Sequence, residues 1–321
     1  MTMPSRPLGW GLLGVMAVLA FTSSAAVAAG TAVSVLSTAD GSWWLWPLGL
    51  FVVCFLLGIV AVPAGVGGGV LFVPIVGGFF PFHLDFVRGA GLLVALASAL
   101  AAGPDLLRGG LASLRLALPL ALLASVSSVV GALCGLSVPA ATVNILLGAT
   151  VLGIVLLMWM GKKDDVPHRH DQDAFWRPLN IAGLYHDFAR GKDVAWRASN
   201  IGLGIVLFAG IGFLGGFFGV GAGWANVPAL NLVMGIPIKV AAATSGLILA
   251  LSSSSATWSY LSAGAIMPII AVPAVVGMML GARIGVRLLT VLGASRIRQM
   301  VMGLLLFAGL RALFKGLGVW V

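Results

Sequence analysis

The sequence predicts an all-α polytopic membrane protein, and its composition and its pattern of apolar segments lead to that prediction. Of its 321 residues, 60% are hydrophobic and only 8% are charged, whereas soluble domains carry about 25% charged residues. Long apolar segments follow one another along the chain, and most are long enough to cross a lipid bilayer as a helix. The composition therefore excludes a soluble enzyme fold.

The apolar segments form two groups of five, separated by one polar stretch. The first group occupies residues 43–160, the polar stretch residues 161–199 and the second group residues 200–315. The individual segments are 43–62, 66–82, 87–103, 112–136, 139–160, 200–219, 221–236, 240–262, 266–290 and 297–315.

The two groups resemble each other in sequence, at a constant offset of 154 residues. The glycine cluster at 65–69 with Val73 and Pro74 recurs as the cluster at 219–223 with Val227 and Pro228. A fixed offset across several motifs is typical of an internal duplication. We therefore expect two structural repeats.

Each glycine cluster opens a segment too short for a straight spanning helix, so we expect a broken helix that crosses the bilayer or re-enters it. Crossing favours a cytoplasmic location for the polar stretch 161–199 and for the 290s connection, as the positive-inside rule prefers. Residues 30–42 and 262–265 then lie outside. Five crossings per half require the second repeat to be inverted relative to the first, whereas re-entrant segments would give a 4+4 arrangement.

Two further segments have recognisable patterns. Residues 1–30 have a basic start, an apolar run and small residues, as in a cleaved secretory signal or an uncleaved anchor helix, and both put Gly30 outside. Within the polar stretch, residues 181–187 and 193–198 flank a turn-like segment, which predicts a short β-hairpin with Tyr185 facing Trp196. The alternative is a solvated connector.

The duplicated glycine clusters predict an anion site. Glycines let the backbone leave the helix and expose amide N–H groups, and the helix that restarts behind them presents a partial positive charge. Two such helix starts, one from each half, would converge near the bilayer midplane. The alternative is that these glycines only permit close packing or a kink. The proposed ligands are the amides of Gly67, Gly68, Gly69, Gly221 and Gly223.

Polar side chains near the clusters extend this candidate site to Asn226, Thr244, Ser245 and Arg88. Hydroxyl groups also bond to the backbone within membrane helices, and an arginine at such a position either snorkels to the interface or faces a cavity. We predict no catalytic residue, metal or cofactor. His168 and His170 with their neighbouring acids are expected to form a charged surface rather than a metal site.

Together these motifs resemble the TauE/SafE family of membrane anion transporters. The resemblance covers roughly residues 45–315 and rests on both glycine clusters, on the prolines that follow them and on residues 235–245. Ala222 departs from the family pattern, because it replaces a glycine in the second cluster. The resemblance implies that sulfur-containing anions such as sulfite or sulfoacetate move across a bacterial cytoplasmic membrane.

We therefore expect a secondary transporter that moves a small oxyanion, sulfite or an organosulfonate, out of the cytoplasm. The alternatives are an anion channel and an importer of another sulfur-containing or organic anion. Outside the polar stretch the only acids are Asp40, Asp85 and Asp105, which favours export without a coupled cation. The expected partners are the anion and the lipid bilayer, with a homodimer left open. Nucleic acid is not expected, because the basic excess reflects membrane orientation.

Overall fold

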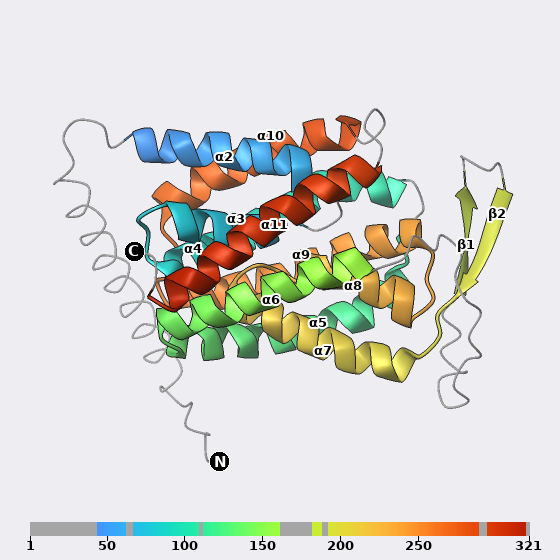
Figure 1. Cartoon of the computed structure of the whole chain (residues 1–321). Helices are drawn as coiled ribbons and strands as arrows, with labels where there is room; N and C mark the ends of the chain where they lie inside the picture. The colour runs from blue at the N-terminus through green and yellow to red at the C-terminus, as the bar shows by residue number, and fades with distance from the viewer. Residues whose placement is uncertain are drawn as a thin grey trace, which may run out of the picture.

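The computed structural model describes residues 44–61, 67–108, 112–160, 182–187, 192–288 and 294–318. The predicted signal or anchor segment 1–30 and the histidines at 168 and 170 lie outside these residues. The described chain is almost entirely helical (Figure 1). Five of its helices are long and apolar enough to cross a membrane, and three shorter apolar helices accompany them. The prediction of an all-α membrane protein is confirmed.

The helices follow the predicted apolar segments closely. The first half contains α2 (Leu45–Ala61), α3 (Gly68–Phe79), α4 (Leu84–Arg108), α5 (Leu114–Ser137) and α6 (Ala140–Met160). The second half contains α7 (Ile201–Phe218), α8 (Gly223–Pro228), the π-helix η2 (Ala229–Val233), α9 (Ile238–Ser262), α10 (Pro268–Leu288) and α11 (Ala294–Gly316). The helices α4, α5 and α6 begin 154 residues before α9, α10 and α11, which is the offset of the sequence motifs.

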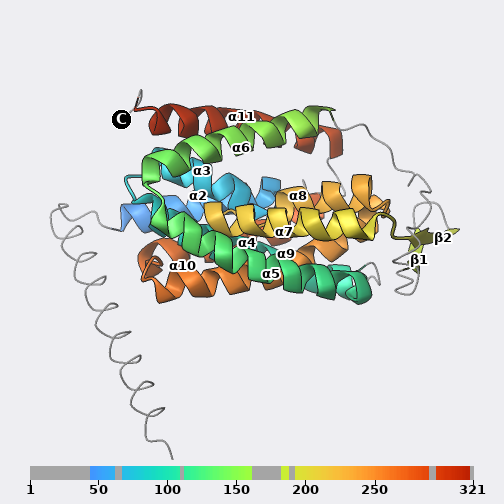
Figure 2. The same ribbon diagram turned by 90° about the horizontal axis from the view of Figure 1, so that it is seen from below.

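The two halves interlock rather than forming separate lobes. The helix α2 packs along α10 on one side of the bundle, and α5 packs along α7 on the other. The core helices α4 and α9 lie between them, while α6 crosses α11 on one face (Figures 1 and 2). The first helix of each half, α2 or α7, thus packs against a helix of the other half, α10 or α5.

Glycines make the α2–α10 and α5–α7 interfaces close. Gly277 and Gly281 of α10 contact the backbone of Phe51 and Phe55 in α2. On the other side, Gly212 and Gly216 of α7 contact the backbone of α5 at Ala124 and Ser128. Helix backbones approach this closely only where side chains are absent, so these four glycines allow the two helix pairs to pack in contact.

Corresponding helices of the two halves run in opposite directions. Gly148 of α6 contacts Gly309 of α11, whereas Ile145, one turn earlier in α6, contacts Gly316, which lies later in α11. The pair α4 and α9 follows the same rule. Gly89, near the start of α4, contacts Ala265 just beyond the end of α9, while Ala95 and Ala99 cluster with Leu249 near the middle of α9.

The polar stretch contains an antiparallel hairpin of β1 (Ala182–Asp187) and β2 (Lys192–Arg197), which lies beyond one end of the bundle (Figure 1). Its register differs from our expectation, because Trp196 pairs with Gly183 and Tyr185 pairs with Val194. Glycine opposite Trp196 leaves room for the indole ring, since a Cβ atom at position 183 would lie 2.9 Å from it. Trp196 is buried and belongs to the same core cluster as Ile201 and Met234, so the hairpin is anchored to the bundle.

Candidate functional site

The second glycine cluster breaks the chain between α7 and α8. Gly219 and Gly221 have φ angles of 70° and 72°, in the left-handed region that glycine adopts without steric cost. The N–H of Gly219 donates to the carbonyl of Gly216, and that of Gly221 donates to the carbonyl of Gly215. These bonds end α7 in the manner of a glycine C-cap, and the chain turns back into α8.

The first cluster also contains a glycine with a positive φ angle just before a helix, and the starts of the two helices lie close together. Gly67 has a φ angle of 80° and directly precedes α3. A Cβ atom placed on Gly67 would lie 3.8 Å from the Cα of Gly223 and 3.3 Å from a methyl group of Leu249. Leu249 also borders Gly221, at 2.9 Å from a Cβ atom placed there. The predicted convergence of the two glycine clusters is therefore present in the fold.

The other glycines of the first cluster have packing roles. The N–H of Gly68 donates to the hydroxyl of Ser98 at 3.3 Å, and a Cβ atom at Gly68 would collide with the side chain of Met278. Gly69 lies against the backbone carbonyls of Val220 and Gly91. In the described part of the first cluster, Gly67 and Gly69 thus both border the second cluster, Gly67 at Gly223 and Gly69 at Val220.

A narrow cavity, too small to hold a water molecule, adjoins the second cluster. The hydroxyl of Ser253 lines it and is buried without a hydrogen-bond partner among the described residues. By contrast, the Ser128 hydroxyl donates to the carbonyls of Ser125 and Ser252. The lining consists of small neutral residues, namely Leu92, Ser128, Gly212, Gly215, Gly216, Gly221, Ala222, Ser252, Ser253 and Ala256.

Asn226 is a second unpaired polar residue, one helical turn from Ala222, which lines this cavity. Its side chain is fully buried, and neither its amide nitrogen nor its amide oxygen has a partner in the described chain. Asn226 follows Ala222 by one helical turn, and its backbone N–H donates to the Ala222 carbonyl. It therefore lies on the face of α8 where Ala222 lines the cavity. Burying an unpaired amide costs about 1–3 kcal/mol, a cost that a bound ligand would remove.

Thr244 and Ser245 are buried in α9. The hydroxyl of Thr244 accepts a hydrogen bond from the backbone N–H of Ser113, at the start of α5. That contact holds α5 against α9 at the end of the bundle near the hairpin. The assignment of Thr244 and Ser245 to the glycine-cluster site stays a prediction.

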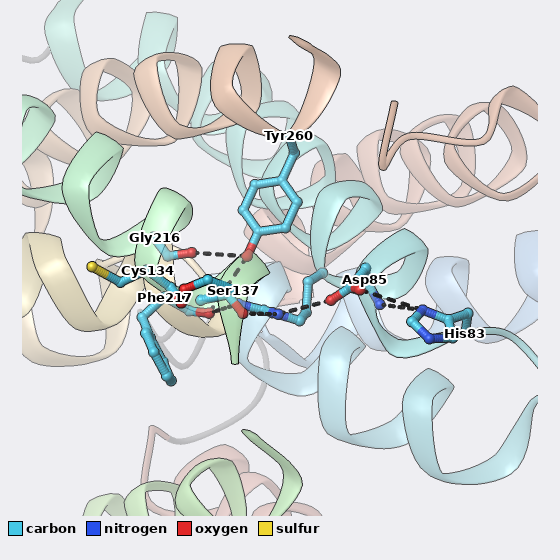
Figure 3. A network of polar contacts seen from close by, with 9 residues as sticks. His83, Asp85, Cys134, Ser137, Gly216, Phe217 and Tyr260 are labelled. Atoms are coloured by element: carbon cyan, nitrogen blue, oxygen red, sulfur yellow. Dashed lines mark hydrogen bonds and ion pairs between the residues drawn. The ribbon is translucent and has the colours of Figure 1, made fainter. Parts of the chain in front are cut away.

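Arg88 is fully buried and donates hydrogen bonds to carbonyls at the ends of two helices. Its guanidinium pairs with Asp85 at 2.9 Å, donates to the carbonyl of Gly135 at the end of α5, and donates to the carbonyl of Phe217 at the end of α7. The rings of Phe217 and Tyr260 flank it, and the Tyr260 hydroxyl donates to the Gly216 carbonyl (Figure 3). A cation near helix C-termini is stabilising, so in this structure the side chain neither snorkels to the surface nor stands free.

The serine run 252–255 is a group of polar residues near the second cluster in the sequence, but neither Ser253 within it nor the network around Arg88 was singled out from the sequence. Ser253 belongs to the run 252–255, in which the other three hydroxyls donate to backbone carbonyls of α9. Only the three-dimensional arrangement distinguishes it from them. For Arg88 a signal was present, because Asp85 precedes it by three residues and residues three apart are neighbours on a helix.

Membrane-spanning helices packed around two converging glycine-rich breaks define a multi-pass membrane transporter. The chain belongs to the family described as sulfite exporter TauE/SafE, whose match covers residues 50–312. The resemblance inferred from the motifs is thus confirmed. The chain is also similar to "Probable membrane transporter protein YunE" of Bacillus subtilis (strain 168), with 31% identity over 144 residues.

That alignment covers 44% of this chain and 53% of the relative, so the match spans about half the length of the relative. No solved structure matches the chain.

Proposed function

We propose that the protein exports a small oxyanion, sulfite or an organosulfonate, from the cytoplasm by alternating access between two inverted repeats. The observation that carries this proposal is the meeting of the helix starts after Gly67 and Gly221, beside a buried cavity with unpaired polar groups. Helix N-termini favour anions, and the unpaired NH₂ group of Asn226 and hydroxyl of Ser253 can donate to one. The family's description as sulfite exporters supports a sulfur oxyanion as the substrate.

The antiparallel packing of α4 with α9 and of α6 with α11 supports the inverted arrangement. When matched helices run in opposite directions, the axis that relates the halves lies in the membrane plane, as in many secondary transporters. The cavity is too narrow for a water molecule, so the described conformation is closed around the site. Movement of one half against the other would open the site to each side in turn.

The charges near the site support export driven by the membrane potential. Asp85, an acid whose side chain the structure describes, is neutralised by Arg88 at 2.9 Å. Moving one negative charge outward through an inside-negative potential gains about 2.3 kcal/mol per 100 mV, and uptake would have to overcome the same energy. We therefore propose electrogenic export without obligatory proton or sodium coupling.

The direct test is flux in proteoliposomes that contain the purified full chain. An imposed potential should drive sulfite toward the positive compartment in the absence of proton and sodium gradients, with a rate that saturates as the sulfite concentration rises. Strict dependence on a cation gradient would contradict the proposed energetics. Flux that never saturates would favour a channel instead.

A further inference from the structure

We infer that the transported species is a singly charged oxyanion that also donates a hydrogen bond, such as hydrogensulfite, and is not a dianion such as sulfite or sulfate. This inference rests on the proposed function, because it concerns the charge and protonation of the anion at the same site. It follows from two observations, the neutrality of the cavity and the unpaired groups of Asn226 and Ser253.

The cavity offers no unbalanced positive charge to an anion. Every residue that lines it is apolar, glycine or serine. On the described parts of the helices around it, the nearest cation is Arg88, whose backbone contacts Gly219 and whose charge is balanced by Asp85. The cost of removing an ion from water grows with the square of its charge, so a dianion costs about four times as much as a monoanion. A neutral, closed site therefore favours one negative charge.

Asn226 presents both an acceptor and a donor. Whichever way its amide is oriented, one oxygen and one NH₂ group are buried without partners. The NH₂ group and the Ser253 hydroxyl can donate to anionic oxygens, but the amide oxygen faces repulsion unless the substrate supplies a hydrogen. Sites built to bind a substrate hydroxyl strongly reject analogues that lack it, because the protein's own polar group then stays unpaired. The O–H of hydrogensulfite meets this requirement.

Sulfite and hydrogensulfite interconvert near neutral pH, which makes the charge state measurable. In proteoliposomes of the full chain, with equal pH on both sides and constant total sulfite, the initial flux should follow the hydrogensulfite fraction. On the alkaline side it should fall about tenfold per pH unit. Sulfate should neither be transported nor compete.

Methanesulfonate provides the control for titration of the protein itself, since it is a monoanion at every pH tested and has no O–H. The protein groups that could titrate near the cavity are Asp85, Arg88 and Tyr260, with His83 beside Asp85, and Lys239 and Arg115 at the far ends of α9 and α5. Any effect of these groups would change methanesulfonate flux as well. We expect that flux to be independent of pH and at least tenfold slower than that of hydrogensulfite.

The variant Asn226→Leu tests the acceptor. It removes a donor that both anions use and an acceptor that only hydrogensulfite uses, so it should slow hydrogensulfite flux at least tenfold, slow methanesulfonate flux less and so reduce the preference between them. Asn144→Leu, at another buried asparagine in α6, is the matched control and should keep the preference. The pH measurement on the wild-type protein needs no variant, so the inference stays testable if Asn226→Leu does not fold.

The possible results distinguish failure of the inference about charge from failure of the proposed export function. Sulfite flux that rises with pH, or efficient sulfate transport, would overturn the inference while leaving oxyanion export intact. Flux of none of the three anions would overturn the proposed function and this inference with it.

Discussion

Substitutions at different glycines of this protein are expected to have different effects on transport and folding. Gly67 and Gly221 combine a left-handed backbone with a position where the two clusters meet. A leucine at either position would fill the space beside Leu249, and the backbone strain would cost about 1–2 kcal/mol. We predict that Gly67→Leu and Gly221→Leu reduce anion flux more than tenfold while folded protein remains in the membrane.

Gly210→Leu is the control for these variants, because a Cβ atom at Gly210 meets no other atom within 4 Å. It should retain wild-type flux and the wild-type elution profile in detergent. Wild-type flux from Gly67→Leu or Gly221→Leu would contradict the glycine-cluster site.

Gly69 should respond differently from Gly67, although the two are close neighbours. A Cβ atom at Gly69 would overlap the carbonyl oxygen of Val220 and lie 2.9 Å from that of Gly91. Both are backbone atoms that cannot move aside cheaply. We predict that Gly69→Ala greatly lowers the yield of folded protein, as measured by size-exclusion chromatography. A well-folded Gly69→Ala protein would show that α3 can shift.

Arg88 is predicted to be a stability residue. Replacing it with glutamine removes the cation from Asp85 and from the carbonyls of Gly135 and Phe217. Losing charged hydrogen bonds in a buried network costs about 2–4 kcal/mol. Arg88→Gln should therefore unfold at a clearly lower temperature in detergent.

Asp85→Asn should have a smaller effect on stability than Arg88→Gln. The Asp85 side chain is 29% exposed, and the guanidinium keeps its two carbonyl partners in that variant. Equal losses in the two variants would mean that the ion pair, and not the bonds to the helix ends, dominates.

At the scale of elements, side chains of α11 contact the C-terminal end of α3. The ammonium group of Lys315 donates to the Gly77 carbonyl at 2.7 Å, and Arg311 lies over the Phe79 ring at 3.8 Å. Cations at a helix C-terminus contribute about 0.3–1 kcal/mol each. We predict that Lys315→Met increases amide hydrogen exchange near Gly77, whereas Lys315→Arg preserves protection. Unchanged exchange in Lys315→Met would show that packing alone holds this end.

Most elements could be predicted from the sequence because apolar length and a repeated glycine pattern determine them. The glycine clusters predicted both helix breaks, since these positions need φ angles that other residues avoid. The π-helix η2 after Pro228 could not be predicted, because the same motif in the first half gives a different structure. There the equivalent residue, Pro74, lies inside the continuous helix α3. The two copies thus share a motif but differ in local backbone geometry.

The candidate site was less predictable, because its polar groups depend on contacts between distant segments. Thr244 lies near the glycine clusters in our sequence argument, yet its hydroxyl bonds to Ser113. Arg88 was expected at an interface or in a cavity, but its partners come from α5 and α7. Hydrogen-bond partners far apart in the chain leave no periodic signal in the sequence.

For the whole molecule, cysteine labelling tests the direction in which the helices insert into the membrane. The arrangement predicts that the start of α11 lies on the cytoplasmic side and the end of α9 outside. In a protein with Cys54 and Cys134 replaced, Ser262→Cys should react with an impermeant thiol reagent from outside, and Ser295→Cys only from inside. Labelling of Ser295→Cys from outside would replace the 5+5 arrangement with the re-entrant 4+4 model.

The exchange of helix partners between the halves has a consequence for biosynthesis. While the ribosome is still translating the second half, α2 and α5 already lie in the bilayer, but their partners α10 and α7 do not yet exist. Lipid must cover the backbone at Gly58, Gly131 and Gly135 during that interval, although these glycines later contact α10 and α7 directly. We therefore expect the newly made N-terminal half to be recognised by membrane proteases and chaperones until the C-terminal half arrives. Cells that produce the two halves from separate genes should accumulate both, whereas cells that produce either half alone should degrade it.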